Sequence, residues 1–335
     1  MHAPPDHPVI PPRKVGVLLV NLGSPDAPTR GAVKRYLAEF LSDPRVVELH
    51  PALWQPILRG VVLNTRPKQS AHAYSTVWAD EGAPLVVITA QQASALADAL
   101  GPQVTVDWAM RYGRPALPDR LRAMKDAGCE RILVAPMYPQ YSAATTATVN
   151  DRAFATLRAM RWQPALRTLP PFHDDPAYIE ALRASLERQL AALDFEPEAI
   201  VASFHSMPLR TLLKGDPYHC HCMKTARLLS GALGRELVVS FQSKLGRAKW
   251  LEPSTEDTLA RLGREGVRRL AVVTPGFIAD NLETLEEIAI RGRETFEEAG
   301  GQRFAALACL NADREGVTLL TALVARELEG WVARS

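Results

Sequence analysis

The sequence predicts an α/β fold with parallel sheets, divided into two similar domains. Short β-rich runs alternate with longer amphipathic stretches along the whole chain, which is the pattern of parallel strands joined by helices. The 335 residues exceed one ordinary core, so two domains of roughly 150 residues each are expected. The second half also repeats a motif of the first. Together these observations favour a duplicated α/β domain.

Seven runs have the length and composition of buried strands. They cover residues 15–22, 104–110, 131–138, 199–204, 236–241, 269–275 and 303–310. Open parallel sheets bind their ligands in the loops at the carboxyl ends of the strands, so functional residues are sought there. A last helix is expected over Glu315–Val332, packed back on the domains.

The repeated motif is a glycine-containing basic loop that leads through a helix to a strand. Residues 110–114, MRYGR, lead to a strand ending at Pro136, and residues 243–247, SKLGR, lead to one ending at Pro275, an offset of roughly 135 residues. Chance similarity between strand–loop–helix units is the alternative. Turn residues collect in Arg167–Pro176, which predicts the break between the halves. We therefore expect domains at 14–165 and 175–312, a C-terminal helical segment at 313–335 and a flexible arm at 1–13.

Composition excludes several classes of protein. A net charge of +2 with 23% charged residues gives no reason to expect a nucleic-acid partner. Met1–Arg13 is too rich in proline for the core of a signal peptide, and no run approaches the roughly 18 apolar residues of a membrane span. The cysteines lack the spacing of a secreted disulfide framework. We expect a cytoplasmic protein with reduced thiols.

His205 is the first candidate for chemistry. It follows the strand expected at 199–204 and precedes Ser206, Met207 and Pro208, so an imidazole emerges at a carboxyl strand end just before a proline turns the chain. A neutral imidazole ligates a divalent metal or accepts a proton. A histidine that only forms structural hydrogen bonds is the alternative.

A helix that begins near Asp280 carries the second candidate group. At about 100° per residue, its carboxylates fall within about 60° of each other on one face. They are Asp280, Glu283, Glu287 and Glu294, and Arg291 interrupts the row. Carboxylates beside an imidazole suit ferrous iron or zinc, and the lack of HExxH or CxxC spacing favours a metal that is held transiently. A solvated acidic face is the alternative.

Two other segments have more than one interpretation. Cys220, His221 and Cys222 could chelate a metal, but a structural or iron–sulfur site needs about four ligands. The apolar stretch Pro51–Leu63 contains a tryptophan and two prolines. It is a candidate mouth for a flat aromatic ligand or a candidate membrane-contacting lip, and composition alone slightly favours ordinary core packing.

Five motifs together resemble the ferrochelatase family along nearly the whole chain. In order they are LLVNLGSPDAP, SFHSMP, GDPYHC, FQSKLGRAKWLEP and PGFIADNLETLEEI, and the GDPYHCHC segment most resembles proteobacterial members. The resemblance implies two Rossmann-like domains of the class II chelatase type, with a porphyrin bound in the cleft between them. It implies His205 as the active-site histidine, Glu283 as its partner, and a proton or metal path through Asp280 and Glu287. It further implies porphyrin-binding residues at Leu22, Arg111, Tyr112, Tyr138, Ser142, Thr145, Ser206 and Pro208.

Three positions depart from the family pattern. Asn281 stands where many members have a histidine, so a second imidazole is not expected in the metal path. Ala143 stands where some members have a cluster cysteine and no cysteine follows Cys309, so a 2Fe–2S cluster is not expected. Arg291 replaces an acidic residue of some relatives. No cofactor is therefore expected, and ferrous iron is a substrate.

The resemblance implies a lyase that inserts ferrous iron into protoporphyrin IX and releases two protons, the last step of haem biosynthesis. His205 and Glu283 share the roles of proton acceptor and first iron ligand, and the sequence does not assign which does which. Arg111, together with Lys68 or Arg66, is expected to pair with the propionates.

Several alternatives stay open. A related chelatase acts on coproporphyrin III or inserts cobalt, and a non-catalytic carrier binds haem or metal without turnover. A two-domain glycosyltransferase binds a nucleotide, although the chain has no GxGxxG or P-loop motif. The expected partners are a porphyrin and ferrous iron. The chain is expected to be a monomer or homodimer, with peripheral contact at the inner membrane left open.

Overall fold

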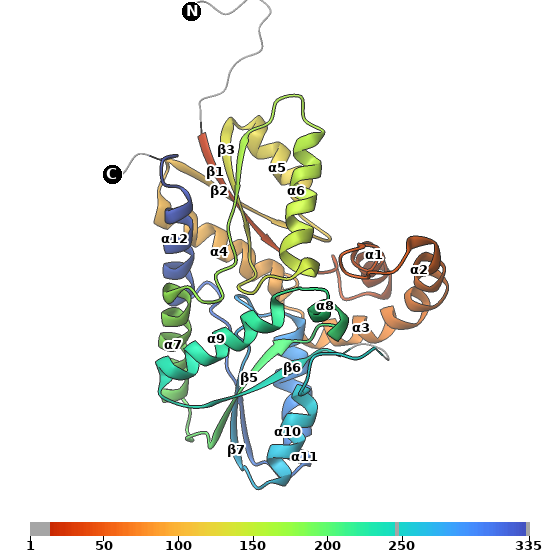
Figure 1. The fold of residues 1–335 in the computed structure, drawn as a ribbon, viewed down its shortest axis with the longest axis vertical. Helices are drawn as coiled ribbons and strands as arrows, with labels where there is room; N and C mark the ends of the chain where they lie inside the picture. Colours follow the sequence, from red (N-terminus) through yellow and green to blue (C-terminus); the bar gives the residue numbers. More distant parts are fainter. Residues whose placement is uncertain (1–13, 245–247, 333–335) are drawn as a thin grey trace, which may run out of the picture.

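The computed structural model describes residues 14–244 and 248–332. The arm expected at 1–13, residues 245–247 of the second repeated motif and the last three residues of the segment 313–335 lie outside the described residues. Two four-stranded parallel sheets organise the chain, one above the other in Figure 1. The predicted α/β class with two parallel sheets is confirmed.

The two sheets have the same topology. Their strand orders are β2-β1-β3-β4 and β6-β5-β7-β8, which agrees with the expected duplication. The strands are β1 (Lys14–Asn21), β2 (Val104–Met110), β3 (Cys129–Pro136), β4 (Ala165–Thr168), β5 (Ala199–His205), β6 (Leu237–Gln242), β7 (Arg269–Val273) and β8 (Arg303–Ala306).

The spacing between the halves is regular except at the first strand. The second, third and fourth strands begin at residues 104 and 237, 129 and 269, and 165 and 303, which gives differences of 133, 140 and 138. The first strands begin at 14 and 199, a difference of 185, because the first crossover at residues 22–103 carries additional helices.

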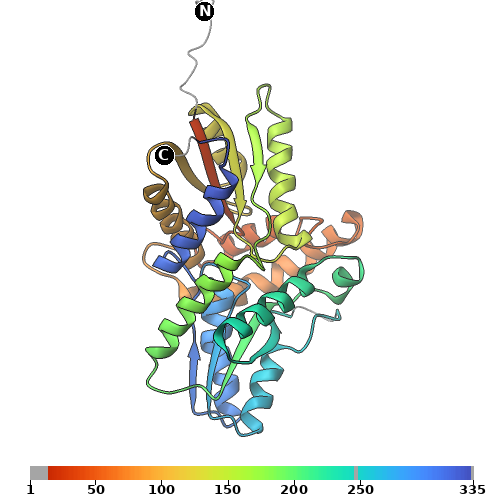
Figure 2. The ribbon, with the colours of Figure 1, turned by 60° about the vertical axis from the view of Figure 1, so that its left-hand side comes forward.

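Helices cover both faces of each sheet (Figures 1 and 2). They are α1 (Arg30–Phe40), α2 (Pro51–Ile57), the π-helix η1 (Leu58–Val62), α3 (Leu63–Val77), α4 (Pro84–Leu100), α5 (Leu117–Asp126), the π-helix η2 (Ala143–Ala147), α6 (Thr148–Arg158), α7 (Pro176–Ala191), α8 (Leu209–Leu213), α9 (Tyr218–Leu233), α10 (Thr255–Arg264), the π-helix η3 (Glu283–Gly292), α11 (Arg293–Glu298) and α12 (Arg314–Glu327).

Strand β4 is an element that the sequence did not predict. Its four residues, ALRT, are half-buried or exposed because β4 is the edge of the first sheet, so they lack the apolar run of an inner strand. It ends at Thr168, three residues beyond the expected end of the first domain at 165. The division of the chain into domains stays a prediction.

One hydrophobic core joins the two halves. Val17 and Leu19 of β1 belong to the same buried cluster as Ile200 and Phe204 of β5. Helix α12 contacts α4 of the first half and α7 of the second, and lies along both in Figure 2. The relative position of the two sheets is therefore fixed by continuous packing.

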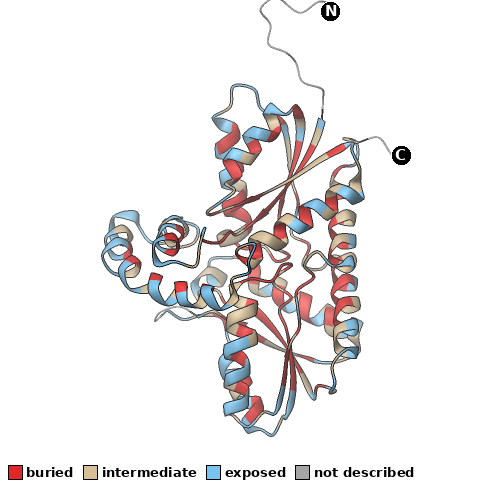
Figure 3. Cartoon of the chain, turned by 180° about the vertical axis from the view of Figure 1, so that it is seen from behind, coloured by how far each residue is buried: buried red, intermediate tan, exposed pale blue. Residues whose placement is uncertain are grey.

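Helices α1, α2 and α3 stand out from the body of the molecule, and much of their surface is exposed (Figure 3). Within the apolar stretch, Leu58 and Leu63 are buried, but Leu53, Ile57 and Val61 are 68%, 47% and 57% exposed. The slight preference for ordinary core packing is therefore wrong, because only one side of this segment faces the protein. No helix in the described ranges is both long and apolar enough to cross a membrane.

Candidate active site

The candidate residues lie at the carboxyl ends of the two central strands of each sheet. In a 2-1-3-4 order the ligand crevice lies at the carboxyl ends of the two central strands, whose connections leave in opposite directions. His205 is the last residue of β5, and the segment 274–282 follows β7, the strand paired with β5. In the first sheet, Leu22 follows β1 and Tyr138 follows β3. Both sets therefore occupy ligand-binding positions of their sheets.

The His205 ring is held by its own turn. Its Nδ1 lies 2.6 Å from the carbonyl oxygen of Ser206. Because a carbonyl only accepts, Nδ1 of the neutral ring carries the proton. Nε2 then keeps its lone pair for a metal ion or a proton.

Ser206 and Pro208 anchor the turn behind His205. Ser206 is fully buried, its backbone nitrogen donates to the oxygen of Gln242 at 2.7 Å, and its hydroxyl donates to the oxygen of Leu251 at 3.1 Å. Pro208 forms an isolated β-bridge with Trp250. The porphyrin contacts expected of Ser206 and Pro208 stay a prediction.

Glu283 is brought to His205 by a neighbouring strand. Gln242 of β6 pairs with His205 in register, and its Nε2 donates to the backbone oxygen of Glu283 at 3.4 Å. Burial raises the pKa of the Glu283 carboxyl, and the positive charge of protonated His205 acts to lower it. A carboxyl with a raised pKa, within electrostatic range of an imidazole, can exchange protons with it.

Two tyrosines of the first half lie within electrostatic range of Glu283. Burial raises the pKa of Tyr36 and that of Tyr74, and the negative charge of Glu283 adds to both rises. Tyr36 is on α1 and donates to the oxygen of Gly23 at 3.1 Å, and Tyr74 is on α3. Sequence reasoning missed both, because a tyrosine on the buried face of an amphipathic helix looks like a core residue.

Asp280 and Glu287 do not present free carboxylates. Asp280 is buried, and its two oxygens accept from Asn311 Nδ2 at 2.7 Å and Thr284 Oγ1 at 2.8 Å. Glu287 accepts from the backbone nitrogen and the hydroxyl of Ser243, at 2.7 and 2.5 Å. The metal or proton path through Asp280 and Glu287 stays a prediction, and it requires that these hydrogen bonds exchange.

The helix that carries Glu283 differs from the predicted one. It is the π-helix η3, whose i→i+5 hydrogen bonds widen each turn. Asp280 lies before η3, and Glu294 lies beyond it, exposed on α11. Just before η3, Asn281 Oδ1 accepts from the backbone nitrogen of Thr284 at 3.1 Å. The prediction of one regular α-helix that begins near Asp280 and carries four carboxylates on one face is therefore wrong.

Arg111 and Tyr112 are held by Asp43. One oxygen of Asp43 accepts from the Arg111 guanidinium and from the Tyr112 hydroxyl, the latter at 2.9 Å, and Arg111 Nε donates to the oxygen of Thr148 at 2.9 Å. The Arg111 and Asp43 side chains are 11% and 8% exposed, so the ion pair is buried. Asp43 therefore already neutralises the Arg111 charge, which weakens the attraction of Arg111 for a propionate. Sequence reasoning missed Asp43, because an aspartate before a proline reads as a turn residue.

The other predicted porphyrin-binding residues of the first half follow β1 and β3. Burial raises the pKa of Tyr138, the charge of Tyr112 adds to the rise and that of Arg111 opposes it. The Tyr138 hydroxyl is buried without a hydrogen-bond partner among the described residues, which favours a ligand or water that completes it. Ser142 is fully buried, and Thr145 Oγ1 donates to its oxygen at 3.3 Å. Leu22 is half-buried.

Within residues 14–244 and 248–332, no group of three or more His, Cys, Asp or Glu side chains could hold a metal ion. Cys220 is exposed and Cys222 is buried. The predicted pair, His205 and Glu283, offers two ligand groups, whereas a tight structural site has about four. Two ligands suit an ion that is passed on to another ligand set.

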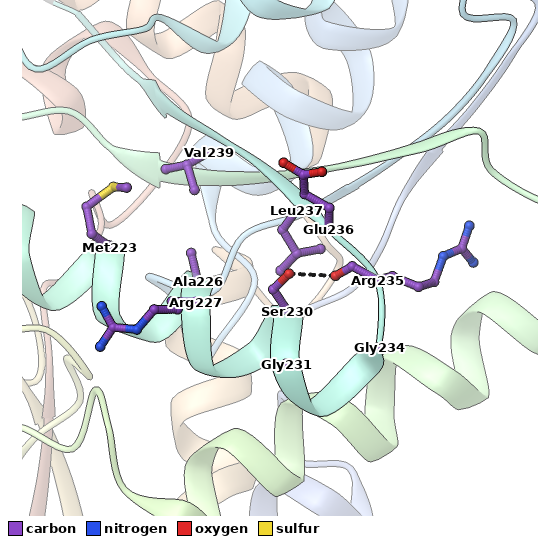
Figure 4. A pocket seen from close by; sticks show the side chains of 10 residues that line it. All are labelled: Met223, Ala226, Arg227, Ser230, Gly231, Gly234, Arg235, Glu236, Leu237 and Val239. Atoms are coloured by element: carbon purple, nitrogen blue, oxygen red, sulfur yellow. Dashed lines mark hydrogen bonds between the residues drawn. The ribbon is translucent and has the colours of Figure 1, made fainter.

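Two surface hollows lie away from these residues. One of about 410 Å³ lies between α9 and β6, and Figure 4 shows Arg227 and Arg235 at its edges. The other, of about 640 Å³, is next to Trp162 at the ends of α5 and α6. Neither hollow is lined by a candidate residue.

Comparison with known proteins finds one family and one fold. The family model described as Ferrochelatase matches residues 14–328. Proteins named Ferrochelatase from Rhizobium meliloti and Agrobacterium fabrum are 54% and 52% identical, and the alignments cover 99% and 98% of this chain and 100% and 98% of the relatives. Among solved structures, SirB from Bacillus subtilis with Fe3+ has a TM-score of 0.57 at 13% identity, over 95% of this chain and 98% of that one. The sirohydrochlorin chelatase SirB in complex with cobalt has a TM-score of 0.54 at 12% identity, over 95% and 96%, and both likenesses concern the fold.

Proposed function

The chain belongs to the ferrochelatase family, and on this premise we propose that His205 and Glu283 form its metal-insertion centre. The chain is a ferrochelatase, a lyase of haem biosynthesis that inserts ferrous iron into protoporphyrin. The observation that supports the assignment of residues is that Gln242, which pairs with His205 in register, donates to the backbone oxygen of Glu283 and so ties the start of η3 to the end of β5.

Insertion of iron into a porphyrin requires a proton acceptor close to a weakly bound metal ion. The macrocycle must lose two pyrrole protons before its nitrogens take the metal, so a positioned proton acceptor speeds insertion. His205 has a free Nε2 in its neutral form, and Glu283 has a pKa raised by burial, so the pair can receive a proton and share it. The same two groups are few enough ligands to release iron to the four porphyrin nitrogens.

The first half supplies the porphyrin wall in this proposal. Leu22, Tyr138, Ser142 and Thr145 lie at or near the carboxyl edge of the first sheet, and the unpartnered hydroxyl of Tyr138 supports a ligand there. Arg66 and Lys68 of α3, half-buried and exposed, remain the candidates for propionate binding that need not leave a buried ion pair.

An iron-insertion assay tests the function. Purified metal-free protein is mixed anaerobically with protoporphyrin IX and ferrous iron, and the loss of porphyrin fluorescence is followed. We expect many turnovers per protein molecule, whereas a carrier gives at most one. Parallel reactions with coproporphyrin III and with cobalt compare the related chelatase activities. Turnover with those substrates alone would contradict the assignment.

We also propose peripheral membrane contact through the exposed side chains Leu53, Ile57 and Val61, in a protein that is a monomer or homodimer. Replacing all three with serine is expected to reduce co-sedimentation with phospholipid vesicles by about tenfold, because apolar area of this size is lost from the interface. Iron insertion with detergent-solubilised porphyrin should stay within about twofold.

The control for this experiment is serine at Phe154 and Trp162, which are 53% and 47% exposed on another part of the surface. Those substitutions should leave vesicle binding unchanged. Equal losses in the two variants would mean that any exposed apolar residue contributes and that the apolar stretch Pro51–Leu63 is not a membrane contact. Analytical ultracentrifugation of the wild type gives the oligomeric state.

A further inference from the structure

The segment around the GDPYHC motif contacts the opposite half of the molecule. Asp216, in the loop before α9, accepts from the backbone nitrogen of Ala143 at 2.8 Å and from the Ser142 hydroxyl at 3.1 Å through Oδ2. Its Oδ1 accepts from the backbone nitrogen of Tyr218 at 3.0 Å. One carboxylate thus joins the start of α9, in the second half, to the start of η2, in the first.

His221 makes the adjoining contact. Its Nδ1 accepts from the backbone nitrogen of Tyr141 at 3.1 Å, so Nδ1 must be unprotonated. Together with Asp216, His221 satisfies backbone or side-chain donors of three successive residues, 141–143. Ser142 is fully buried and its two neighbours are half-buried, so removal of the acceptors leaves at least the Ser142 hydroxyl without access to water.

The clamped segment leads directly to the predicted porphyrin wall. The oxygen of Ser142 accepts from the backbone nitrogen of Thr145 at 3.2 Å and from its hydroxyl at 3.3 Å. Tyr138 lies three residues before Tyr141, in the same loop after β3. The position of this wall is therefore set from the half that carries His205.

The His221 ring is also packed so that it stays neutral. It stacks on His173, with ring centroids 3.6 Å apart and planes 4° apart. Burial lowers the pKa of His221 and lowers that of His173 to about 4, with the charge of His221 as a second cause for His173. The charges that face His221 are Asp174 and Asp216, which oppose this shift, and Lys224, which adds to it.

We propose that Asp216 and His221 are positioning residues, which hold the segment 138–145 of the first half in register with the His205 turn of the second. This inference rests on the proposed function, because the porphyrin contacts of the segment are themselves part of that proposal. It assigns a role to the GDPYHC motif. The motif sets the distance between the segment 138–145 and the His205 turn, which are the two sides of the proposed porphyrin site. Neither Asp216 nor His221 touches the substrate in this arrangement.

Binding of protoporphyrin IX without iron is the main test, measured by fluorescence titration at constant detergent concentration. We expect Asp216→Ala to raise the Kd, and the KM in the insertion assay, by about tenfold, the size of effect that a lost buried acceptor gives. The kcat of the variant should change by less than about threefold, because His205 and Glu283 stay in place. Asp313→Asn is the control, since Asp313 pairs with Arg188 elsewhere on the surface.

A pair of substitutions at His221 separates positioning from mere folding. His221→Asn keeps an acceptor where Nδ1 lies and should bind porphyrin almost like the wild type, whereas His221→Leu should resemble Asp216→Ala. If the variants lose thermal stability but bind with unchanged Kd and KM, the residues are only structural and the inference is wrong. Equal weakening in Asn and Leu variants would also overturn it.

The clamp further predicts a pH dependence. Protonation of His221 removes the acceptor for Tyr141, and because burial lowers the pKa of His221, this loss comes at a pH below the ordinary titration range of a histidine. In that acidic range the wild type should lose porphyrin affinity faster than His221→Asn. Parallel pH curves for the two proteins would contradict this. Because no iron is present, these outcomes do not depend on whether His205 and Glu283 insert the metal, which the assay of His205→Ala decides separately.

Discussion

Replacing His205 with alanine is expected to lower the rate of iron insertion by about a thousandfold, within the range that a lost general base gives. Within the part of the chain that the structure describes, the ring makes one hydrogen bond, from Nδ1 to the neighbouring Ser206 oxygen, and it is half-buried, so the fold should be kept. Insertion is measured anaerobically by porphyrin fluorescence, and the fold by circular dichroism and thermal unfolding.

The matched control is His72→Ala. His72 is exposed on α3 and should give wild-type rates. Protoporphyrin binding by His205→Ala should stay within about threefold, because the proposed role of His205 concerns the proton and the metal. A variant at His205 that folds and inserts iron at a near-normal rate would remove this residue from the mechanism and leave Glu283 without its partner.

The sequence predicted the arrangement of the inner strands because their residues are buried on both faces and therefore form unbroken apolar runs. Strand β5 with His205 at its end is the clearest case, since the ring emerges where a parallel sheet binds ligands. Strand β4 was missed for the opposite reason, because edge residues share the composition of loops.

The local pattern of residues in the sequence could not predict which side chains pair across the molecule. The partner of Arg111 is Asp43, which is 68 residues away along the chain, and Tyr36 and Tyr74 approach Glu283 from helices of the other half. Such pairs depend on how the two halves pack together. The spacing of residues along a single sequence does not reveal contacts between segments so far apart.

The helix of Glu283 shows a second limit. Its composition is that of an amphipathic α-helix, so a 3.6-residue period was the natural prediction. Its π-helical turns are accompanied by tertiary bonds of Asp280 to Asn311 and of Glu287 to Ser243, which the local sequence pattern does not reveal. These bonds occupy two of the four predicted carboxylates, while Glu283 lies within electrostatic range of His205.

Glu283→Gln is expected to lower the rate of iron insertion and to raise the stability of the fold. Iron insertion should fall by about a hundredfold, since the amide neither accepts a proton nor binds iron as a carboxylate does. Burial raises the pKa of Glu283, so above its pKa in the unfolded chain the folded protein holds this carboxylate unfavourably, and stability is lost as pH rises. A neutral amide removes that penalty, and a gain of about 1 kcal/mol corresponds to a Tm rise of about 2–4 °C.

Calorimetry of the metal-free proteins at neutral pH measures the stability, and the fluorescence assay measures insertion. Glu294→Gln is the control, because an exposed carboxylate on α11 should change neither quantity. A Glu283→Gln protein with lower Tm and lower activity would mean that the carboxylate supports the fold, and that its effect on insertion is indirect. A higher Tm together with lost insertion would indicate that Glu283 is a functional group. A charge that is unfavourable for folding is retained because activity needs it.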